Sequence, residues 1–166
     1  MNSPGDVIST IRQGDGPGGR PTGLEQLTRL RDGGPSAVGV AGLLDMAIDD
    51  LGVGHVVFTA ATRPAFGNPL GTLHGGITAT LLDSAMTCAV MSALPAGASA
   101  TTLDLSVRYL RSAPLDGTRV WAVGDLVHRG RTVATAEGRL VDEHDRLLAT
   151  ATTTCLVIGV QGEAVA

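Results

Sequence analysis

Residues 68–87 (NPLGTLHGGITATLLDSAMT) form the densest grouping in the chain of residues that could do chemistry. Gly75 and Gly76 open an apolar stretch of helical character. The first N–H groups of a helix have no backbone acceptor and lie at the positive end of the helix dipole. Glycine lets a substrate atom approach this backbone closely. These N–H groups could therefore stabilise the oxyanion that develops when a carbonyl is attacked.

The same predicted helix carries a carboxylate, Asp83, among apolar neighbours. A poorly solvated carboxylate can act as a general base or as a nucleophile. Thr87 lies one turn further on the same face, where its hydroxyl could bind Asp83 or a water molecule. Asn68, in the loop before the helix, supplies an amide that can orient a nucleophile. The grouping indicates a site that attacks an activated carbonyl.

Each of these residues also has a purely structural explanation when taken alone. The glycine pair permits a tight helix start, a single Asp on a helix is usually solvated, and Thr87 can fill the core. Solvation of Asp83 is difficult within so apolar a run. The combination therefore favours a functional site.

The helical spacing predicts that one chain cannot complete this site. Gly75 and Asp83 are two turns apart, which is about 12 Å at 1.5 Å per residue. One carbonyl cannot contact both groups at that separation. We therefore expect a homo-oligomer whose active site is shared between two subunits.

Composition excludes several other classes of protein. All twelve basic residues are arginines, which rules out a Schiff-base lysine and a P-loop lysine. The net charge of −4 gives no electrostatic reason to bind nucleic acid or an anionic membrane. Residues 14–19 (GDGPGG) match a dinucleotide-binding motif only formally, because no second strand and acidic partner follow. The four histidines lack the spacing of metal ligands, so no metal is expected.

Residues 77–98 imitate a membrane span, with Asp83 as the only charged residue. An Asp at the centre of a span would cost roughly 2.5–3.5 kcal/mol, and Pro95 and Gly97 interrupt the end. We predict instead the central helix of a globular domain. Cys88 and Cys155 lie in apolar or Ala/Thr-rich stretches without a preceding signal peptide, which favours the reducing cytoplasm.

The remaining pattern predicts an α+β domain. A short helix is expected over residues 23–32, two strands near 45–51 and 54–62, and the long helix from about 74 to 94. Four strands follow, at about 100–111, 118–129, 132–142 and 146–158. In the first of these four, Leu103, Leu105, Val107 and Tyr109 alternate with polar residues, which predicts one apolar face. We expect a curved antiparallel sheet wrapped around one central helix, spanning residues 23–160, with a flexible leader (1–22) and tail (161–166).

The run N-P-L-G-T-L-H-G-G-x-x-x-x-L-L-D-x-A-M resembles the signature of hotdog-fold thioesterases of the phenylacetate-pathway (PaaI-like) type. Residues 102–113, 127–131 and 147–154 resemble the later strands of that family, so the resemblance covers about 36–158. It implies a hotdog fold and hydrolysis of an acyl- or aryl-acyl-CoA to free acid and CoA. It also implies a homodimer or homotetramer and no cofactor, since coenzyme A is part of the substrate.

The resemblance assigns roles to individual residues. Asp83 matches the catalytic carboxylate, Gly75 the N–H that polarises the thioester carbonyl, and Asn68 the group that orients water or thioester. Thr87 and Thr102 match hydroxyls near the carboxylate. The substrate-binding residues expected are His74, whose role we judge mainly structural, together with Gly76, Gly130 and the candidate phosphate ligands Arg108, Arg111, Arg129 and Arg131.

Two alternative functions remain open on the sequence. A hotdog-fold hydratase or dehydratase of acyl thioesters would pair a His with the acidic residue, and His74 lies nine residues from Asp83. A non-catalytic acyl-CoA-binding module would bind ligand without turnover. The intact set of Asp83, Asn68 and Thr102 favours the hydrolase.

Overall fold

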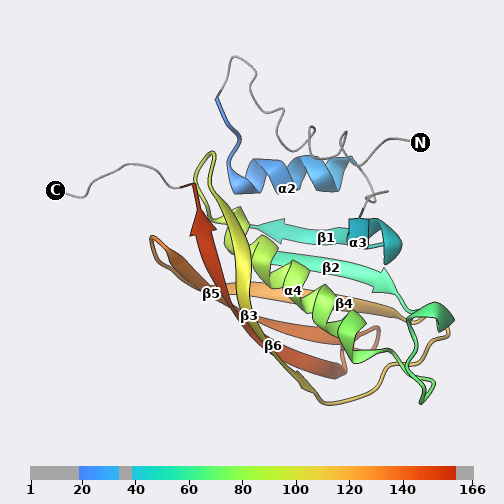
Figure 1. The fold of residues 1–166 in the computed structure, drawn as a ribbon. Helices are drawn as coiled ribbons and strands as arrows, with labels where there is room; N and C mark the ends of the chain where they lie inside the picture. The colour runs from blue at the N-terminus through green and yellow to red at the C-terminus, as the bar shows by residue number, and fades with distance from the viewer. Residues whose placement is uncertain (1–18, 34–38, 160–166) are drawn as a thin grey trace.

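A computed structural model describes residues 19–33 and 39–159 as an antiparallel sheet curved around one long helix (Figure 1). The six strands are ordered β1-β2-β4-β5-β6-β3. This arrangement confirms the predicted fold class. The helices are α2 (Gly23–Asp32), α3 (Gly39–Leu43), the 3₁₀ turn η1 (Pro64–Phe66) and α4 (Gly75–Ser92); the strands are β1 (Ala47–Gly52), β2 (His55–Ala61), β3 (Ser99–Tyr109), β4 (Arg119–Arg129), β5 (Val133–Asp142) and β6 (Leu147–Ile158). The proposed tail, and the leader up to residue 18, lie outside the described residues.

The core lies between α4 and the concave face of the sheet. The helix residues that face the sheet are fully buried: Leu81, Leu82, Ala85, Met86, Ala89 and Val90. Gly124 of β4 allows the helix to rest directly on the strand, because a Cβ atom there would overlap the Ala85 carbonyl. Most residues of α4 are thus used for packing. Its apolar run is that of a buried central helix, and no described helix meets the length and hydropathy needed to cross a membrane.

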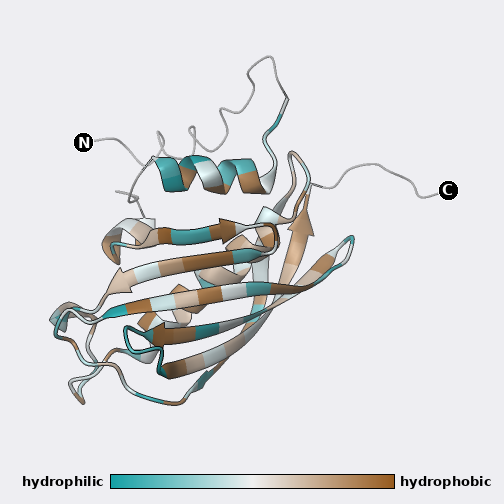
Figure 2. Ribbon diagram, turned by 180° about the vertical axis from the view of Figure 1, so that it is seen from behind, coloured by the Kyte–Doolittle hydropathy of each residue, from teal (hydrophilic) through white to brown (hydrophobic). Residues whose placement is uncertain are grey.

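Helix α2 packs on the C-terminal end of α4 and on β1. Hydrophilic residues lie between hydrophobic ones along it (Figure 2), and Leu27 is its anchor, at 1% exposure. Gly23 permits the approach to α4, since a Cβ atom at this position would overlap the Met91 carbonyl. Thr22 caps the helix by accepting from the Glu25 N–H, while the Glu25 carboxylate accepts from the Thr22 N–H.

The last residues of the expected leader contact the domain. The Pro21 carbonyl accepts from the Gly97 N–H at 3.3 Å, and Arg20 lies against Gly97. Residues 20–22 therefore lie against the folded domain, and the boundary at residue 23 stays a prediction.

Strand β3 contains a β-bulge at Leu103. Thr102 pairs with Cys155 and Asp104 with Thr154 of β6, so Leu103 is the extra residue. The bulge changes which face the preceding side chains take. Thr102 points inward, while Leu103 is 58% exposed. The alternation predicted for this strand holds for Leu105 and Val107 but is wrong at Leu103, and Tyr109 at the strand end is also exposed.

Candidate active site

Asp83 lies on the side of α4 that faces β3. The Thr102 hydroxyl donates to Asp83 Oδ1 at 2.7 Å, and the Thr87 hydroxyl lies 2.9 Å from the Thr102 oxygen. Because the Thr102 proton is directed at the carboxylate, Thr87 is the donor to Thr102. The structure thus brings together the three predicted residues as a chain of hydrogen bonds. Thr87 contacts Asp83 through Thr102 and not directly.

This series of hydrogen bonds leaves one oxygen of the Asp83 carboxylate available. Among the described residues, Thr102 is the only one that donates a hydrogen bond to Asp83. The hydrogen bond from Thr102 holds Asp83 Oδ1 in place, whereas Asp83 Oδ2 accepts no hydrogen bond from the described residues. A carboxylate with one fixed and one free oxygen can accept a proton from water or attack a carbonyl carbon.

The neighbouring thiols are poor nucleophiles. Desolvation and, to a smaller extent, the negative charge of Asp83 raise the pKa of the Cys88 thiol to about 12. Burial likewise raises the pKa of Cys155, whose sulfur lies 3.8 Å from the Thr87 hydroxyl. Only a thiolate is strongly nucleophilic, so both cysteines are inert at neutral pH. Of these neighbouring groups, Asp83 is therefore the better candidate for a nucleophile or base.

Asp83, Thr87 and Thr102 open on a cavity of about 810 Å³. This volume is typical of small-molecule sites, which measure roughly 300–1,000 Å³. Most of the larger apolar side chains in the lining come from α2, α3, β1, the residue before β1, and β2: Leu27, Leu30, Ala41, Met46, Ile48 and Phe58. A carboxylate at the edge of an apolar cavity would suit a substrate that carries an apolar group beside a reactive carbonyl.

A second group of predicted residues lies at the N-terminus of α4. His74 is the N-cap, and its Nδ1 accepts from the Gly76 N–H at 2.8 Å. The N–H groups of Ile77 and Thr78 both donate to the His74 carbonyl. Within residues 19–33 and 39–159, the Gly75 N–H donates no hydrogen bond. Gly75 is thus the free donor expected of an oxyanion site, while Gly76 is engaged by His74.

Asn68 organises the loop before the helix. Its Oδ1 accepts from the N–H groups of Leu70 (2.9 Å) and Thr72 (3.2 Å), and its Nδ2 donates to the Thr72 hydroxyl at 3.0 Å. Asn68 lines a smaller cavity of about 310 Å³ together with Gly75. The Asn68 amide thus shares a cavity with the Gly75 N–H, but its hydrogen bonds go to Leu70 and Thr72 of its own loop.

Sequence reasoning missed Tyr109 as a member of this group. Its hydroxyl donates to the Gly75 carbonyl at 3.0 Å. The signal that could have found it is the antiparallel return of β3 along α4, which brings the last residue of the strand back to the first residue of the helix.

The two groups remain separate within one chain. Asp83 lines the larger cavity, whereas Gly75 and Asn68 line the smaller one. Eight residues of α4 separate Gly75 from Asp83, or about 12 Å along the helix. A single carbonyl cannot contact both groups of the same chain.

The arginines predicted to bind phosphate also separate into two places. Arg108 and Arg111 lie at the end of β3 near the start of α4, and Arg111 lines the smaller cavity. Arg129 donates to the Ala93 carbonyl at the other end of α4, at 2.8 Å, where a cation complements the helix dipole. The turn beyond it holds the two remaining predicted residues, Gly130 and Arg131.

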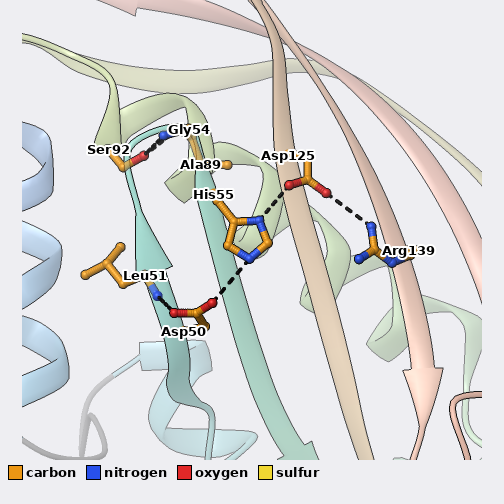
Figure 3. A network of polar contacts seen from close by, with 8 residues as sticks. All are labelled: Asp50, Leu51, Gly54, His55, Ala89, Ser92, Asp125 and Arg139. Atoms are coloured by element: carbon orange, nitrogen blue, oxygen red, sulfur yellow. Dashed lines mark hydrogen bonds and ion pairs between the residues drawn. The ribbon is translucent and has the colours of Figure 1, made fainter.

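A further polar cluster lies on the sheet face turned away from α4 (Figure 3). His55 Nδ1 is 2.6 Å from Asp125 Oδ1, Arg139 donates to Asp125 Oδ2 at 3.2 Å, and Asp50 lies 3.6 Å from His55 Nε2. This cluster links β1, β2, β4 and β5 and takes no part in either cavity. In the described residues, no three His, Cys, Asp or Glu side chains gather as a metal ion would require.

Known proteins resemble this chain in sequence and in structure. Residues 70–149 match the thioesterase superfamily domain. Mouse acyl-coenzyme A thioesterase 13 is 37% identical over 76 residues, which are 46% of this chain and 53% of that protein. The chain thus spans about half the length of the curated relatives it matches.

Two solved structures resemble the chain over most of their own length. A phenylacetic acid degradation-related protein from Ralstonia eutropha JMP134 is 32% identical, with a TM-score of 0.70, and the match covers 78% of this chain and 98% of that one. A Streptococcus mutans UA159 protein bound to acetyl-CoA is 31% identical, with a TM-score of 0.64, and the match covers 69% and 89%. Such identity over nearly complete domains indicates common descent. The chain belongs to the thioesterase superfamily and has its hotdog fold.

Proposed function

We propose that the protein hydrolyses acyl-CoA thioesters to a free acid and coenzyme A. The observation that carries this proposal is the Asp83 carboxylate, held by Thr102 through one oxygen and free at the other, at the edge of an apolar cavity. The mouse relative is named an acyl-coenzyme A thioesterase, and the S. mutans relative was solved with acetyl-CoA bound. Both names support the same substrate class.

Two routes for Asp83 give the same products. As a general base, it takes a proton from water while the water oxygen attacks the thioester carbon. As a nucleophile, it forms an acyl anhydride that water then opens. Either route breaks the C–S bond, and the departing sulfur leaves as the thiol of coenzyme A. The reaction consumes one water and needs no cofactor, because coenzyme A belongs to the substrate.

The oxyanion that forms in either route requires a donor. The free Gly75 N–H at the start of α4 suits this role by direction and by the helix dipole. Because Gly75 and Asp83 of one chain line different cavities, we assign them to two subunits of a homodimer. Each site then takes Asn68 and Gly75 from one subunit and Asp83 from its partner. Two such dimers would form the homotetramer that the family resemblance implies.

The apolar cavity beside Asp83 is our candidate site for the acyl group. Its walls are mainly aliphatic, and Phe58 is the one aromatic residue that lines it in the described chain. Among the arginines predicted to bind phosphate, Arg111 is our candidate for contact with coenzyme A, because it lines the smaller cavity together with Gly75. We place the reaction in the cytoplasm, since the two free thiols suit a reducing compartment.

The structure disfavours the hydratase alternative. A hydratase pairs a His with its acidic residue, but His74 Nδ1 is occupied by the Gly76 N–H at the helix N-cap. A binding module without turnover would place no demand on the orientation of Asp83, yet Thr102 orients it. The hydrolase accounts for both contacts.

Asp83→Asn tests the proposal. We expect kcat for free-thiol release to fall about 10²–10⁴-fold, the range for a positioned acid–base or nucleophilic group, with the fold retained. Asp125→Asn is the matched control: it makes the same chemical change on the opposite face of the sheet and should leave kcat unchanged. Both variants should be measured on aryl, short-chain and long-chain acyl-CoAs. Wild-type kcat in a folded Asp83→Asn variant would end the assignment of the carboxylate.

A further inference from the structure

The peptide group between Gly75 and Gly76 is held at both of its polar atoms. The Tyr109 hydroxyl donates to the Gly75 carbonyl oxygen at 3.0 Å. His74 Nδ1 accepts from the Gly76 N–H at 2.8 Å. The two partners come from opposite sides: His74 directly precedes the helix, and Tyr109 ends the strand that returns along it.

The glycine pair makes these two contacts possible. A Cβ atom on Gly75 would lie 3.1 Å from Tyr109 Cζ, and one on Gly76 would lie 3.1 Å from His74 Nδ1. Both distances are tighter than ordinary contacts, so a side chain at either position would push its partner away. Neither glycine has a positive φ. The pair therefore serves close approach by Tyr109 and His74, and not an unusual backbone conformation.

Because the Gly75–Gly76 peptide is fixed, the orientation of the neighbouring Gly75 N–H is restricted as well. Of the first four N–H groups of α4, those of Gly76, Ile77 and Thr78 have acceptors within the N-cap residue. The Gly75 N–H is the one of these four without an acceptor in the described residues. Its direction depends on how the peptide group on the C-terminal side of Gly75 is held. Preorganised donors stabilise an oxyanion more than donors that must reorient during the reaction.

We propose that Tyr109 is a positioning residue for thioester hydrolysis, which aims the Gly75 N–H at the developing oxyanion through the Gly75–Gly76 peptide. This inference rests on the proposed function. Tyr109 makes its hydrogen bond from the surface, where its side chain is 55% exposed. A surface hydrogen bond adds little to stability, so the contact matters more for geometry than for folding.

Tyr109→Phe tests this role, because it keeps the ring over Gly75 and removes only the hydroxyl. We expect kcat to fall about 3- to 10-fold, as one neutral hydrogen bond permits, with KM within about twofold and Tm unchanged. Tyr109→Leu removes the ring as well and should lower kcat further. Thr118→Val is the matched control, since it removes another exposed hydroxyl that donates to a neighbouring group and should leave kcat unchanged.

The outcomes separate this inference from the proposed function. If the wild-type protein releases no thiol from any acyl-CoA, the proposed function fails. If the wild type is active and Tyr109→Phe retains wild-type kcat, only the positioning role is overturned. A raised KM at unchanged kcat would make Tyr109 a binding residue instead. A loss of kcat accompanied by a Tm several degrees lower would make it a structural residue, and either result contradicts the inference.

Discussion

At the residue scale, the chemistry depends on how Asp83 is held. Thr87 donates to Thr102, and Thr102 donates to Asp83 Oδ1. Both hydroxyl protons of this hydrogen-bond series therefore point toward the carboxylate. A carboxylate fixed by one oxygen presents the other at a constant angle to the substrate. Correct placement of a reactive group within a fraction of an ångström accounts for a substantial part of catalysis. We therefore expect Thr102 to affect the rate although it carries no reactive electrons itself.

Thr102→Val should lower kcat about 3- to 10-fold, because it removes the hydroxyl while keeping a side chain of nearly the same shape. Thr87→Val should cost less, since it acts on the carboxylate only through Thr102. Thr102→Ser restores the hydroxyl and should recover most of the rate. Steady-state assays with Thr152→Val, on the exposed side of β6, provide the control. Equal losses in the Val and Ser variants would show that the hydroxyl is unimportant.

At the element scale, the strands were predictable from their alternating hydrophobic pattern, and the long helix was predictable from its apolar run. The bulge was not. Residues 103, 105, 107 and 109 alternate as a regular strand would, and nothing in that pattern signals an extra residue at Leu103. The periodicity alone thus directs Thr102 away from the core, and only the family resemblance placed it near Asp83.

Residue type alone did not predict where some of the charged and aromatic side chains lie. Arginine suits phosphate chemically, but Arg129 is used at the C-terminal end of α4 because the β4–β5 turn lies there. Tyr109 fits the apolar side of a strand by spacing, yet it covers Gly75 because β3 returns to the start of the helix. Both outcomes depend on which element lies beside which, and local sequence does not encode that.

The contact between α2 and α4 shapes the larger cavity, our proposed acyl site, and can be tested at the same scale. Gly23→Ala introduces a Cβ atom that overlaps the Met91 carbonyl, so α2 must move away from α4. We expect the free energy of unfolding to fall by about 1–3 kcal/mol, as overpacking typically costs. Because Leu27 and Leu30 line the cavity, kcat/KM should fall more for long-chain acyl-CoAs than for acetyl-CoA.

Gly52→Ala is the control for this change, because a Cβ atom there meets nothing within 4 Å. We expect the urea concentration at the midpoint of unfolding of Gly52→Ala to be close to that of the wild type. A uniform loss of kcat/KM across all chain lengths in Gly23→Ala would show that α2 does not border the acyl group.

At the scale of the whole molecule, the two halves of the site lie along one helix and face different cavities. Asp83 is held by β3 near the middle of α4, and Gly75 is free at the start of α4 beside Asn68. A second copy of the chain would supply the missing half to each, and a twofold dimer would complete two equivalent sites. We therefore propose that catalysis requires Asp83 from one subunit and the Asn68–Gly75 end of α4 from the other.

Complementation between two impaired variants tests this proposal most directly. Asp83→Asn and Asn68→Ala are unfolded together, refolded as a mixture and assayed for thiol release, with subunit exchange verified by mass spectrometry. Random pairing makes half of the dimers hybrid, and each hybrid holds one intact site of two, so about a quarter of wild-type sites should return. Asp83→Asn mixed with Thr102→Val is the control, because both changes fall in the same half and no hybrid contains an intact site. Activity above both parents only in the first mixture is the result we predict; no recovery there despite proven exchange would place the whole site within one chain.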